Sequence, residues 1–330
     1  MAWGDTGWQL GIRPTAEARA LMAELDVAHV QHPFLSGRVA LAHCRPHRIP
    51  IVFTNHTRYD LYSDTYAGWV PREVRMAYLR RYLCHFVTRI DLTIAPSASI
   101  ADWLSELGIT DGVVVLPNGV DTVPFTSPAK PRSRASLGLA RGAVVLAYLG
   151  RLGHEKNIGV LLEAFATAAA RDDRLALVLV GDGPARKEAQ TRIAAAGLAE
   201  RTRFLGLTPY GEVPNVLATC DAFATASVSE VHPLVVVEAM AAGLPVLGVH
   251  SPGISDTVDD GVSGLLVAEV DAVLLAERMN AIAADPALRS RLSAGARAGA
   301  ARYDIRATGA RLLAAYEHLL ARDSRNDTPA

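Results

Sequence analysis

The stretch SEVHPLVVVEAMAAGLPV, residues Ser229–Val246, places a carboxylate, a proline, an apolar run and a second carboxylate in that order. In one continuous helix, Glu230 and Glu238 would project ~80° apart and lie ~12 Å apart along the axis, too far to share a ligand easily. Pro233 is a favoured first residue of a helix, which puts Glu230 in the preceding loop and Glu238 in the second turn. Backbone N–H groups near Leu234–Val236 then favour an anion between the carboxylates.

Sugar nucleotides carry hydroxyl groups on both sides of a diphosphate, which matches this layout. Carboxylates accept hydrogen bonds from sugar and ribose hydroxyls, while backbone amides hold the phosphates. The spacing of Glu230 and Glu238 fits a surface helix with two solvated glutamates equally well. Other segments of the chain therefore have to distinguish the two interpretations.

Short apolar runs alternate with helical patterns on both sides of FTSPAKPRSRAS (Phe125–Ser136), a segment rich in proline, serine and positive charge. The alternation is typical of parallel α/β domains, and the segment indicates a linker between two of them. The strands predicted before the linker are Val27–Gln31, Ile51–Thr54, Leu92–Ala95 and Val113–Leu116. The strands predicted after it are Val144–Leu149, Leu175–Val180, Arg203–Leu205, Ala222–Thr225, Pro245–Gly248 and Leu265–Val267.

The second series forms a complete Rossmann-like set, and the first has only four strands. We expect domains at residues 1–128 and 129–304. A helix over residues 305–322 should pack back towards the first domain, and the tail over residues 323–330 should be disordered.

Composition excludes several classes of protein. Half of the residues are hydrophobic, but no apolar run reaches the ~18 residues of a membrane-spanning helix. The formal net charge of −1 gives no general attraction to nucleic acid. Cys44, Cys84 and Cys220 are far apart, which predicts reduced thiols that serve packing. The start MAWGDTGWQL lacks the basic and apolar regions of a secretory signal, so we expect a cytoplasmic protein.

Two motifs resemble the retaining glycosyltransferases of family 4 (glycosyl transferases group 1), which have the two-domain GT-B fold. A glutamate, seven residues, a glutamate and then AMA-x-G-x-PV match Glu230, Glu238 and Ala239–Val246. A strand ending in G-R-L and followed by E-K matches YLGRLGHEKN, Tyr148–Asn157. The resemblance covers nearly the whole chain. It implies transfer of a hexose from a nucleoside-diphosphate sugar, of the UDP-glucose or GDP-mannose type, to an acceptor hydroxyl with retained configuration.

The resemblance also implies roles for single residues. Arg151 and Lys156 would grip the leaving diphosphate, to which a guanidinium fork and a compact ammonium are suited. Glu238 would bind the ribose, and Glu230 would contact hydroxyls of the donor sugar. Gly253 would let the backbone approach the donor, although an ordinary turn explains this glycine as well. The remaining donor-site candidates are Gly150, Leu207, Leu234 and Val235, with the base near Arg203–Tyr210.

The chain departs from the commoner family pattern after the first glutamate. Val231, His232 and Pro233 replace the frequent G-F-G, and a proline has no N–H to donate. The identity of the donor sugar therefore stays open.

VFTNHTRYD (Val52–Asp60) ends a predicted strand and resembles the family's active-site histidine loop. The resemblance implies that His56 holds the primary hydroxyl of the donor sugar and shields the reaction centre. A lone histidine at a strand end is more often structural, but the carboxyl end of a parallel strand faces the crevice where such folds bind ligands. His32, at a similar strand end, is an acceptor-side candidate.

The expected mechanism needs neither a metal nor another cofactor. Positive groups and amides would stabilise the leaving diphosphate, whose oxygen would take the acceptor's proton on the same face. A covalent intermediate on Glu230 is a variant. Asp172–Asp173 and Asp259–Asp260 lie in predicted turns without a convincing set of metal ligands. GDGPAR (Gly181–Arg186) lacks the third glycine of a dinucleotide fingerprint, which argues against an oxidoreductase.

Other functions remain open beside this one. An inactive or truncated homologue could serve as a nucleotide-binding or partner module, and GT-B epimerases and sugar phosphorylases share the fold. Donor hydrolysis and transfer assays distinguish these alternatives.

A predicted helix over Pro71–Ile90 carries five arginines and the aromatic residues Tyr78, Tyr82 and Phe86 at helical spacing. The aromatic stripe fits a domain core. It also fits a helix resting on an anionic membrane as a peripheral contact at the inner face. HPFLSG and HTRYDLY resemble the lipid glucosyltransferases of the family, which favours a membrane glycerolipid as acceptor.

The N-terminal domain is expected to lack its first strands. Thr15–Leu25 predicts one helix, and roughly two strand–helix units that family members place before the segment at Val27–Gln31 are not found. The edge of that strand would then be exposed and transfer impaired, while donor binding by the second domain survives.

Overall fold

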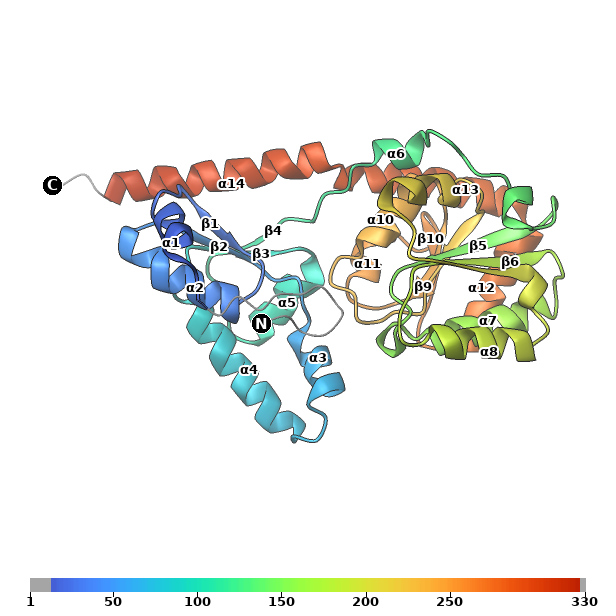
Figure 1. Cartoon of the computed structure of the whole chain (residues 1–330), viewed down its shortest axis with the longest axis horizontal. Helices are drawn as coiled ribbons and strands as arrows, with labels where there is room; N and C mark the ends of the chain where they lie inside the picture. Colours follow the sequence, from blue (N-terminus) through green and yellow to red (C-terminus); the bar gives the residue numbers. More distant parts are fainter. Residues whose placement is uncertain (1–12, 327–330) are drawn as a thin grey trace. The chain divides into compact units, whose positions relative to one another are not determined.

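The computed structural model describes residues 13–326. The chain forms two compact units: one comprises Met1–Pro117 and Gly309–Ala330, and the other comprises Asn118–Thr308 (Figure 1). The chain thus passes between units after residue 117, where the sequence predicted residue 128. Residues 327–330, the last part of the predicted disordered tail, lie outside the described range.

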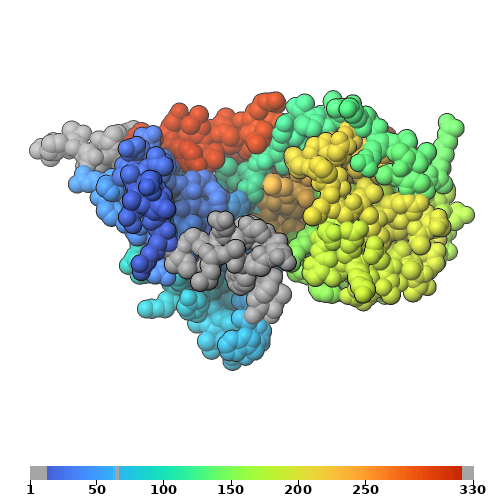
Figure 2. All heavy atoms as spheres, in the orientation of Figure 1, coloured from blue at the N-terminus to red at the C-terminus, as the bar shows by residue number. Residues whose placement is uncertain are grey.

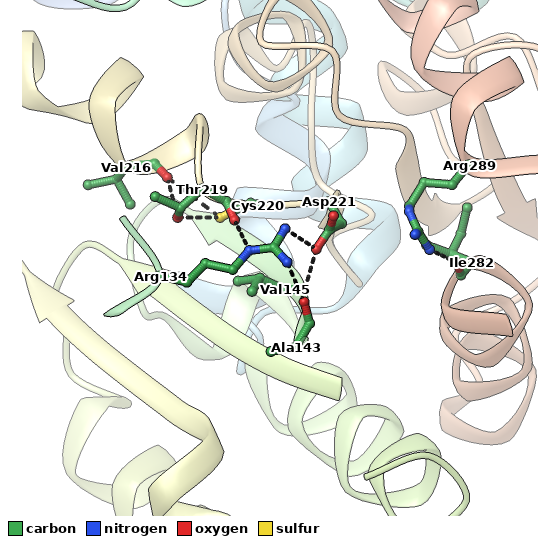
Figure 3. Close-up of polar contacts among 9 residues, drawn as sticks. All are labelled: Arg134, Ala143, Val145, Val216, Thr219, Cys220, Asp221, Ile282 and Arg289. Carbon is green, nitrogen blue, oxygen red and sulfur yellow. Dashed lines mark hydrogen bonds and ion pairs between the residues drawn. The ribbon is translucent and has the colours of Figure 1, made fainter. Parts of the chain in front are cut away.

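The predicted linker is bound to the second unit, which explains the shifted boundary. Val120 and Phe125 are buried in that unit's core. The Arg134 guanidinium donates to the carbonyl oxygens of Thr219 (3.0 Å) and Ala143 (2.6 Å) and to Asp221 (2.8 Å) (Figure 3). A segment whose composition indicates a loop is therefore fixed by contacts with residues about 85 positions away along the chain.

Within the described residues, the first unit is built on four parallel strands in the order β1-β2-β3-β4, close to the predicted positions. The strands are β1 (Ala28–Val30), β2 (Ile51–Thr54), β3 (Leu92–Ala95) and β4 (Val113–Val115). The helices are α1 (Ala16–Ala23), α2 (Leu35–His43), α3 (Tyr59–Tyr66), α4 (Arg72–Val87), α5 (Ala98–Glu106) and most of α14 (Ile305–Asn326). In the described part of the sheet, β1 pairs on one side only, and a cavity of about 450 Å³ lies beside it, lined by residues that include Met22, Val30 and Val39.

The C-terminal helix α14 packs on the sheet of the first unit. Its residues Leu312, Tyr316 and Leu319 contact a buried cluster formed by Val52, Ile94 and Leu116. The helix begins at Ile305 as predicted but continues to Asn326, so residues 323–326, predicted to be disordered, are helical. Helix α14 therefore packs against the first unit's core, although it follows the second unit in sequence.

The predicted aromatic stripe on α4 divides between core and surface. Phe86 is buried against Phe53, with ring centroids 5.3 Å apart. Tyr82 stacks on Phe34 at 4.8 Å, whereas 63% of Tyr78 is exposed. Helix α4, cyan in Figure 2, lies at the surface of its unit.

The second unit has six parallel strands in the order β10-β9-β8-β5-β6-β7, the doubly wound order of Rossmann folds. The strands are β5 (Val144–Leu149), β6 (Leu175–Val180), β7 (Thr202–Gly206), β8 (Ala222–Ala224), β9 (Val246–Val249) and β10 (Gly264–Val267). The helices are α6 (Val123–Thr126), α7 (Ile158–Ala169), α8 (Arg186–Ala195), α9 (Val213–Leu217), α10 (Leu234–Ala241), α11 (Ile254–Thr257), α12 (Ala272–Ala284) and α13 (Pro286–Ala300).

Strands β5 and β8 are neighbours although 72 residues lie between Leu149, the end of β5, and Ala222, the start of β8. The strand order reverses between them, and open α/β sheets bind ligands at the carboxyl ends of strands at such a point. The loops that follow β5 and β8 are therefore the place to look for a site. Within residues 13–326, no helix has both the length and the apolar character needed to cross a membrane.

Candidate functional site

The loops after β5 and β8 are held together by Asn157. This residue adopts the left-handed conformation (φ 52°), precedes helix α7, and donates from Nδ2 to the carbonyl oxygen of Ala226 at 3.0 Å. Asparagine tolerates this backbone conformation better than most residues. The contact brings the G-R-L…E-K motif beside the first glutamate of the second motif.

Lys156 and Glu230 form an ion pair at the centre of the site. Lys156 Nζ lies 2.7 Å from Glu230 Oε1, and their side chains are 23% and 19% exposed. The hydroxyl of Ser227 donates to the same carboxylate oxygen, also at 2.7 Å. The structure thus joins two residues that the sequence had assigned to different parts of the donor, and it adds Ser227, which the sequence analysis missed.

Arg151 lies at the open side of the same loop. Its Nη1 is 3.5 Å from Glu155 Oε1, and 59% of the side chain is exposed. The Tyr148 hydroxyl donates to the Arg151 carbonyl oxygen at 2.8 Å. Burial and the nearby carboxylates of Glu230 and Glu155 raise the pKa of Tyr148, so the phenol stays a donor and fixes the loop. The guanidinium of Arg151 remains accessible to an anion.

The backbone of the GDGPAR segment packs closely against the loop that follows β5. A Cβ on Gly181 would lie 1.9 Å from the Gly150 carbonyl oxygen, and one on Gly183 would lie 2.5 Å from that of Leu152. The Leu152 N–H donates to the Asp182 carbonyl oxygen at 3.0 Å. These glycines therefore allow two backbones to pack closely, a structural role that their resemblance to a dinucleotide motif did not predict.

Helix α10 begins one residue later than expected. Pro233 is its N-cap (φ −78°, ψ 99°) and Leu234 its first residue. The Val236 N–H donates to the Pro233 carbonyl oxygen, so the free amides predicted over Leu234–Val236 are reduced to two. Within the described residues, the N–H groups of Leu234 and Val235 have no protein acceptor. These free N–H groups form the positive end of the helix, four and five residues after Glu230 in the chain.

Glu238 lies in the second turn of α10, as predicted, and is only 6% exposed. Its Oε1 accepts a hydrogen bond from the Tyr210 hydroxyl at 3.1 Å. Burial raises the pKa of Glu238, and this hydrogen bond opposes the rise. Sequence reasoning placed Tyr210 at the end of the segment expected near the base, but it did not predict the contact with Glu238, which lies 28 residues later.

Gly253 precedes α11 with a φ of 79°. A Cβ at this position would lie 2.6 Å from the Glu230 carbonyl oxygen. The glycine is thus required by the backbone of Glu230. Its expected approach to the donor stays a prediction.

The segment predicted to face the base has two different parts. Leu207 and Tyr210 follow β7 and are 84% and 61% exposed. Arg203 points elsewhere, because its guanidinium donates to the carbonyl oxygens of Leu137 and Gly138, both at 2.6 Å. Its role is therefore structural.

The histidine candidates lie in the first unit. The Nε2 atom of His56 is 2.5 Å from Gln31 Oε1. His29, which sequence reasoning missed, bonds through Nε2 to Thr54 Oγ1 at 2.7 Å and through Nδ1 to the Tyr316 hydroxyl. Burial, with a smaller effect of His56, lowers the pKa of His29 to about 4.

His32 belongs to an aromatic cluster in the same unit. Its ring lies 5.2 Å from that of Phe34 and 5.6 Å from that of Tyr59. These contacts give His32 a packing role. Its acceptor-side role stays a prediction.

The acidic pairs considered as metal ligands form local contacts. Asp172 binds Arg174 at 2.6 Å, and Asp259 binds Arg302 at 3.0 Å. In the part of the chain that the structure describes, no three His, Cys, Asp or Glu side chains are grouped so as to hold a metal ion. Cys44, Cys84 and Cys220 are free thiols.

Comparison with known proteins gives a consistent result for both units. The family model described as glycosyl transferases group 1 matches residues 129–299, and that described as glycosyltransferase family 4 matches residues 2–123. The chain is similar to the D-inositol 3-phosphate glycosyltransferase of Actinosynnema mirum, with 35% identity over 91% of this chain and 74% of that protein.

Another relative is the alpha-monoglucosyldiacylglycerol synthase of Streptococcus pneumoniae, which is 30% identical over 74% of this chain. The aligned region spans 56% of that synthase, little more than half of its length. Among solved structures, HepE of Anabaena in complex with UDP is similar in fold, with a TM-score of 0.78, 23% identity, and coverage of 92% of this chain and 81% of that one. The chain belongs to the group 1 glycosyltransferases of family 4 and has their α/β GT-B fold.

Proposed function

We propose that the protein is a retaining hexosyltransferase that uses a nucleoside-diphosphate sugar, with UDP-glucose as the first donor to test and GDP-mannose as the second. The observation that carries the proposal is the Lys156–Glu230 ion pair, which precedes two free amides at the start of α10 and the buried Glu238 in its second turn. Cationic and N–H donors meet a diphosphate, and the two carboxylates meet hydroxyls on either side of it. HepE, a neighbour in fold, has been solved with UDP-glucose.

The chemistry assigned to the site is stabilisation of the leaving diphosphate. As the sugar–oxygen bond breaks, negative charge grows on the phosphate that departs. Arg151 and Lys156, with the N–H groups of Leu234 and Val235, supply positive charge there without a metal. Glu230, released from Lys156, accepts hydrogen bonds from the sugar. The acceptor oxygen then bonds to the anomeric carbon on the face that the diphosphate leaves, which retains the configuration, and a leaving phosphate oxygen takes the proton of the acceptor hydroxyl.

For the acceptor we propose a membrane glycerolipid. Two curated relatives are named alpha-monoglucosyldiacylglycerol synthases. In the first unit, Trp69, Val74 and Tyr78 are 87%, 57% and 63% exposed. Trp69 precedes helix α4, which carries Val74 and Tyr78 and also the exposed Arg72 and Arg81. Apolar side chains among arginines suit peripheral contact with an anionic bilayer from the cytoplasmic side.

An inositol phosphate is the second candidate acceptor. It is favoured by the similarity to D-inositol 3-phosphate glycosyltransferases, which covers 91% of this chain. The two acceptors differ in whether a membrane is needed, so a single set of assays distinguishes them.

The test measures nucleotide release and sugar transfer by the purified chain with UDP-glucose or GDP-mannose. The acceptors are diacylglycerol in anionic vesicles, the same lipid in neutral vesicles, and soluble inositol phosphate. Transfer that requires anionic vesicles supports the lipid proposal, and it should fall when Trp69 and Tyr78 are changed to serine. Transfer to inositol phosphate alone would reject the lipid acceptor. Nucleotide binding without turnover would support the alternative of a binding module.

A further inference from the structure

We propose that Tyr210 is a positioning residue of the nucleotide site, whose hydroxyl holds the Glu238 carboxylate through Oε1 and leaves Oε2 for a ribose hydroxyl of the donor. The inference deepens the proposed function and rests on it. It predicts that the Tyr210 hydroxyl strengthens binding of the nucleoside end of the donor and increases the preference for an intact ribose.

The geometry fixes both partners of this contact. Tyr210 lies in the 3-10 turn Tyr210–Glu212, after β7, and its hydroxyl is 3.1 Å from Glu238 Oε1. Its ring packs edge-on against Phe125, which is 2% exposed, with centroids 6.2 Å apart and planes at 70°. The remainder of the side chain is open, because 61% of Tyr210 is exposed. The residue is thus anchored at one edge and at its hydroxyl.

Glu238 needs such a partner because it is buried. A buried carboxylate is unfavourable unless hydrogen bonds replace its lost water. Within the described residues, Tyr210 is the one side chain that hydrogen-bonds this carboxylate. An ionised carboxylate accepts at both oxygens, so one bond to Oε1 leaves Oε2 available.

Other ionisable groups around α10 are engaged elsewhere. On α13, the Arg297 guanidinium donates to the carbonyl oxygens of Ala241 and Ala242. On α11, Asp256 accepts from the Gly253 N–H at 3.2 Å. The His232 ring, before α10, lies against Tyr303, with centroids 4.9 Å apart. Burial raises the pKa of Tyr210, and the negative charges of Glu238 and Asp121 add to this rise. Helix α6 and strands β8 and β9, which also pack against α10, carry no ionisable side chain.

Two opposing effects on the pKa of Glu238 therefore predict what loss of the hydroxyl does. Burial raises this pKa, and the Tyr210 hydrogen bond lowers it. Without the hydroxyl, Glu238 takes up a proton at higher pH and loses an acceptor for the ribose. Nucleotide affinity should then begin to fall at a higher pH than in the wild type.

The experiment is calorimetric titration of the full chain with UDP and with 2′,3′-dideoxy-UDP between pH 5 and pH 8, with GDP in parallel. Tyr210→Phe keeps the ring and removes the hydroxyl. We expect its UDP affinity to fall about tenfold, the size of one hydrogen bond to a charged group. The fall in UDP affinity at acid pH should begin at a higher pH than in the wild type. The preference for UDP over the dideoxy analogue should become smaller.

Two control variants isolate the contact. Glu212→Gln changes a side chain of the same turn. It should leave unchanged the pH dependence of UDP affinity and the preference for UDP over the dideoxy analogue. In a Glu238→Gln background, Tyr210→Phe should have no further effect on ribose preference. Thermal melting checks that all variants are folded.

Three outcomes would overturn the inference. Tighter UDP binding by Tyr210→Phe would mean that the hydroxyl competes with the ribose. An unchanged affinity and pH profile would remove Tyr210 from the site, while Glu238-dependent binding of UDP still supports the proposed function. A wild-type chain that binds neither UDP nor GDP would reject the proposed function itself.

Discussion

Substitution of Glu230 by glutamine should strengthen nucleotide binding and weaken sugar transfer. In the structure Lys156 is already paired with Glu230, 2.7 Å away. A diphosphate must draw the ammonium away from this carboxylate. Glu230→Gln keeps the shape of the side chain but removes its charge, so Lys156 becomes free to meet the phosphates.

The size of the effect follows from the pair. Two unit charges 2.7 Å apart attract by about 6 kcal/mol at an effective dielectric constant of ~20. About a fifth of each side chain is exposed, so desolvation and screening reduce the net value to about 1–2 kcal/mol. UDP affinity should therefore rise about 5- to 30-fold in Glu230→Gln. Turnover should fall, because the donor sugar loses a charged acceptor for its hydroxyls.

Calorimetry with UDP on wild type, Glu230→Gln, Lys156→Met and the double variant forms a complete cycle. Lys156→Met should bind UDP more weakly than wild type, and adding Glu230→Gln to it should bring no gain. Urea unfolding of the same four proteins measures the pair's contribution to stability. If Glu230→Gln binds UDP no more tightly than wild type, the competition between carboxylate and diphosphate does not exist.

Three further predictions concern other parts of the chain. Gly253→Ala should lower the free energy of unfolding by about 1–3 kcal/mol in urea titrations. The reason is that φ is 79° and that the new Cβ would lie 2.6 Å from the Glu230 carbonyl oxygen. An unchanged stability would show that this backbone shifts easily. His56→Ala should reduce sugar transfer and leave UDP affinity nearly intact, because the diphosphate and ribose candidates lie in the other unit; equal transfer rates would remove His56 from the active site. The pKa of His29 in the folded protein is about 4, below the ordinary value near 6.5, so folding favours the neutral ring. The free energy of unfolding should therefore fall by about 2 kcal/mol as the pH drops from 6.5 towards 4, a value reduced for partial screening of the ring. In melting curves, His29→Gln should abolish that part of the pH dependence.

The sequence by itself determined the elements and the family. The ten strands of the described residues lie within one or two residues of their predicted positions, because buried parallel strands are short apolar runs that turn residues delimit. The helix at Thr15–Leu25 appears as α1, with Thr15 as its cap. The two motifs supplied the candidate donor-site residues, since the loops that carry them are local in sequence.

The tertiary structure decided which of these residues meet. Lys156 and Glu230 are 74 residues apart and touch only because β5 and β8 are adjacent where the strand order reverses. Tyr210 reaches Glu238 from another loop at the same edge. The glycine at residue 253 is needed by a backbone that lies 23 residues earlier, at Glu230.

The boundary between the units was likewise a tertiary property. Composition marks Phe125–Ser136 as a linker, yet Phe125 and Arg134 are bound into the second unit by partners far along the chain. Periodicity reports how a segment exposes its own side chains, one turn or pleat at a time. The partners that bury Phe125 and satisfy Arg134 are specified by the order of the strands, which local periodicity does not contain.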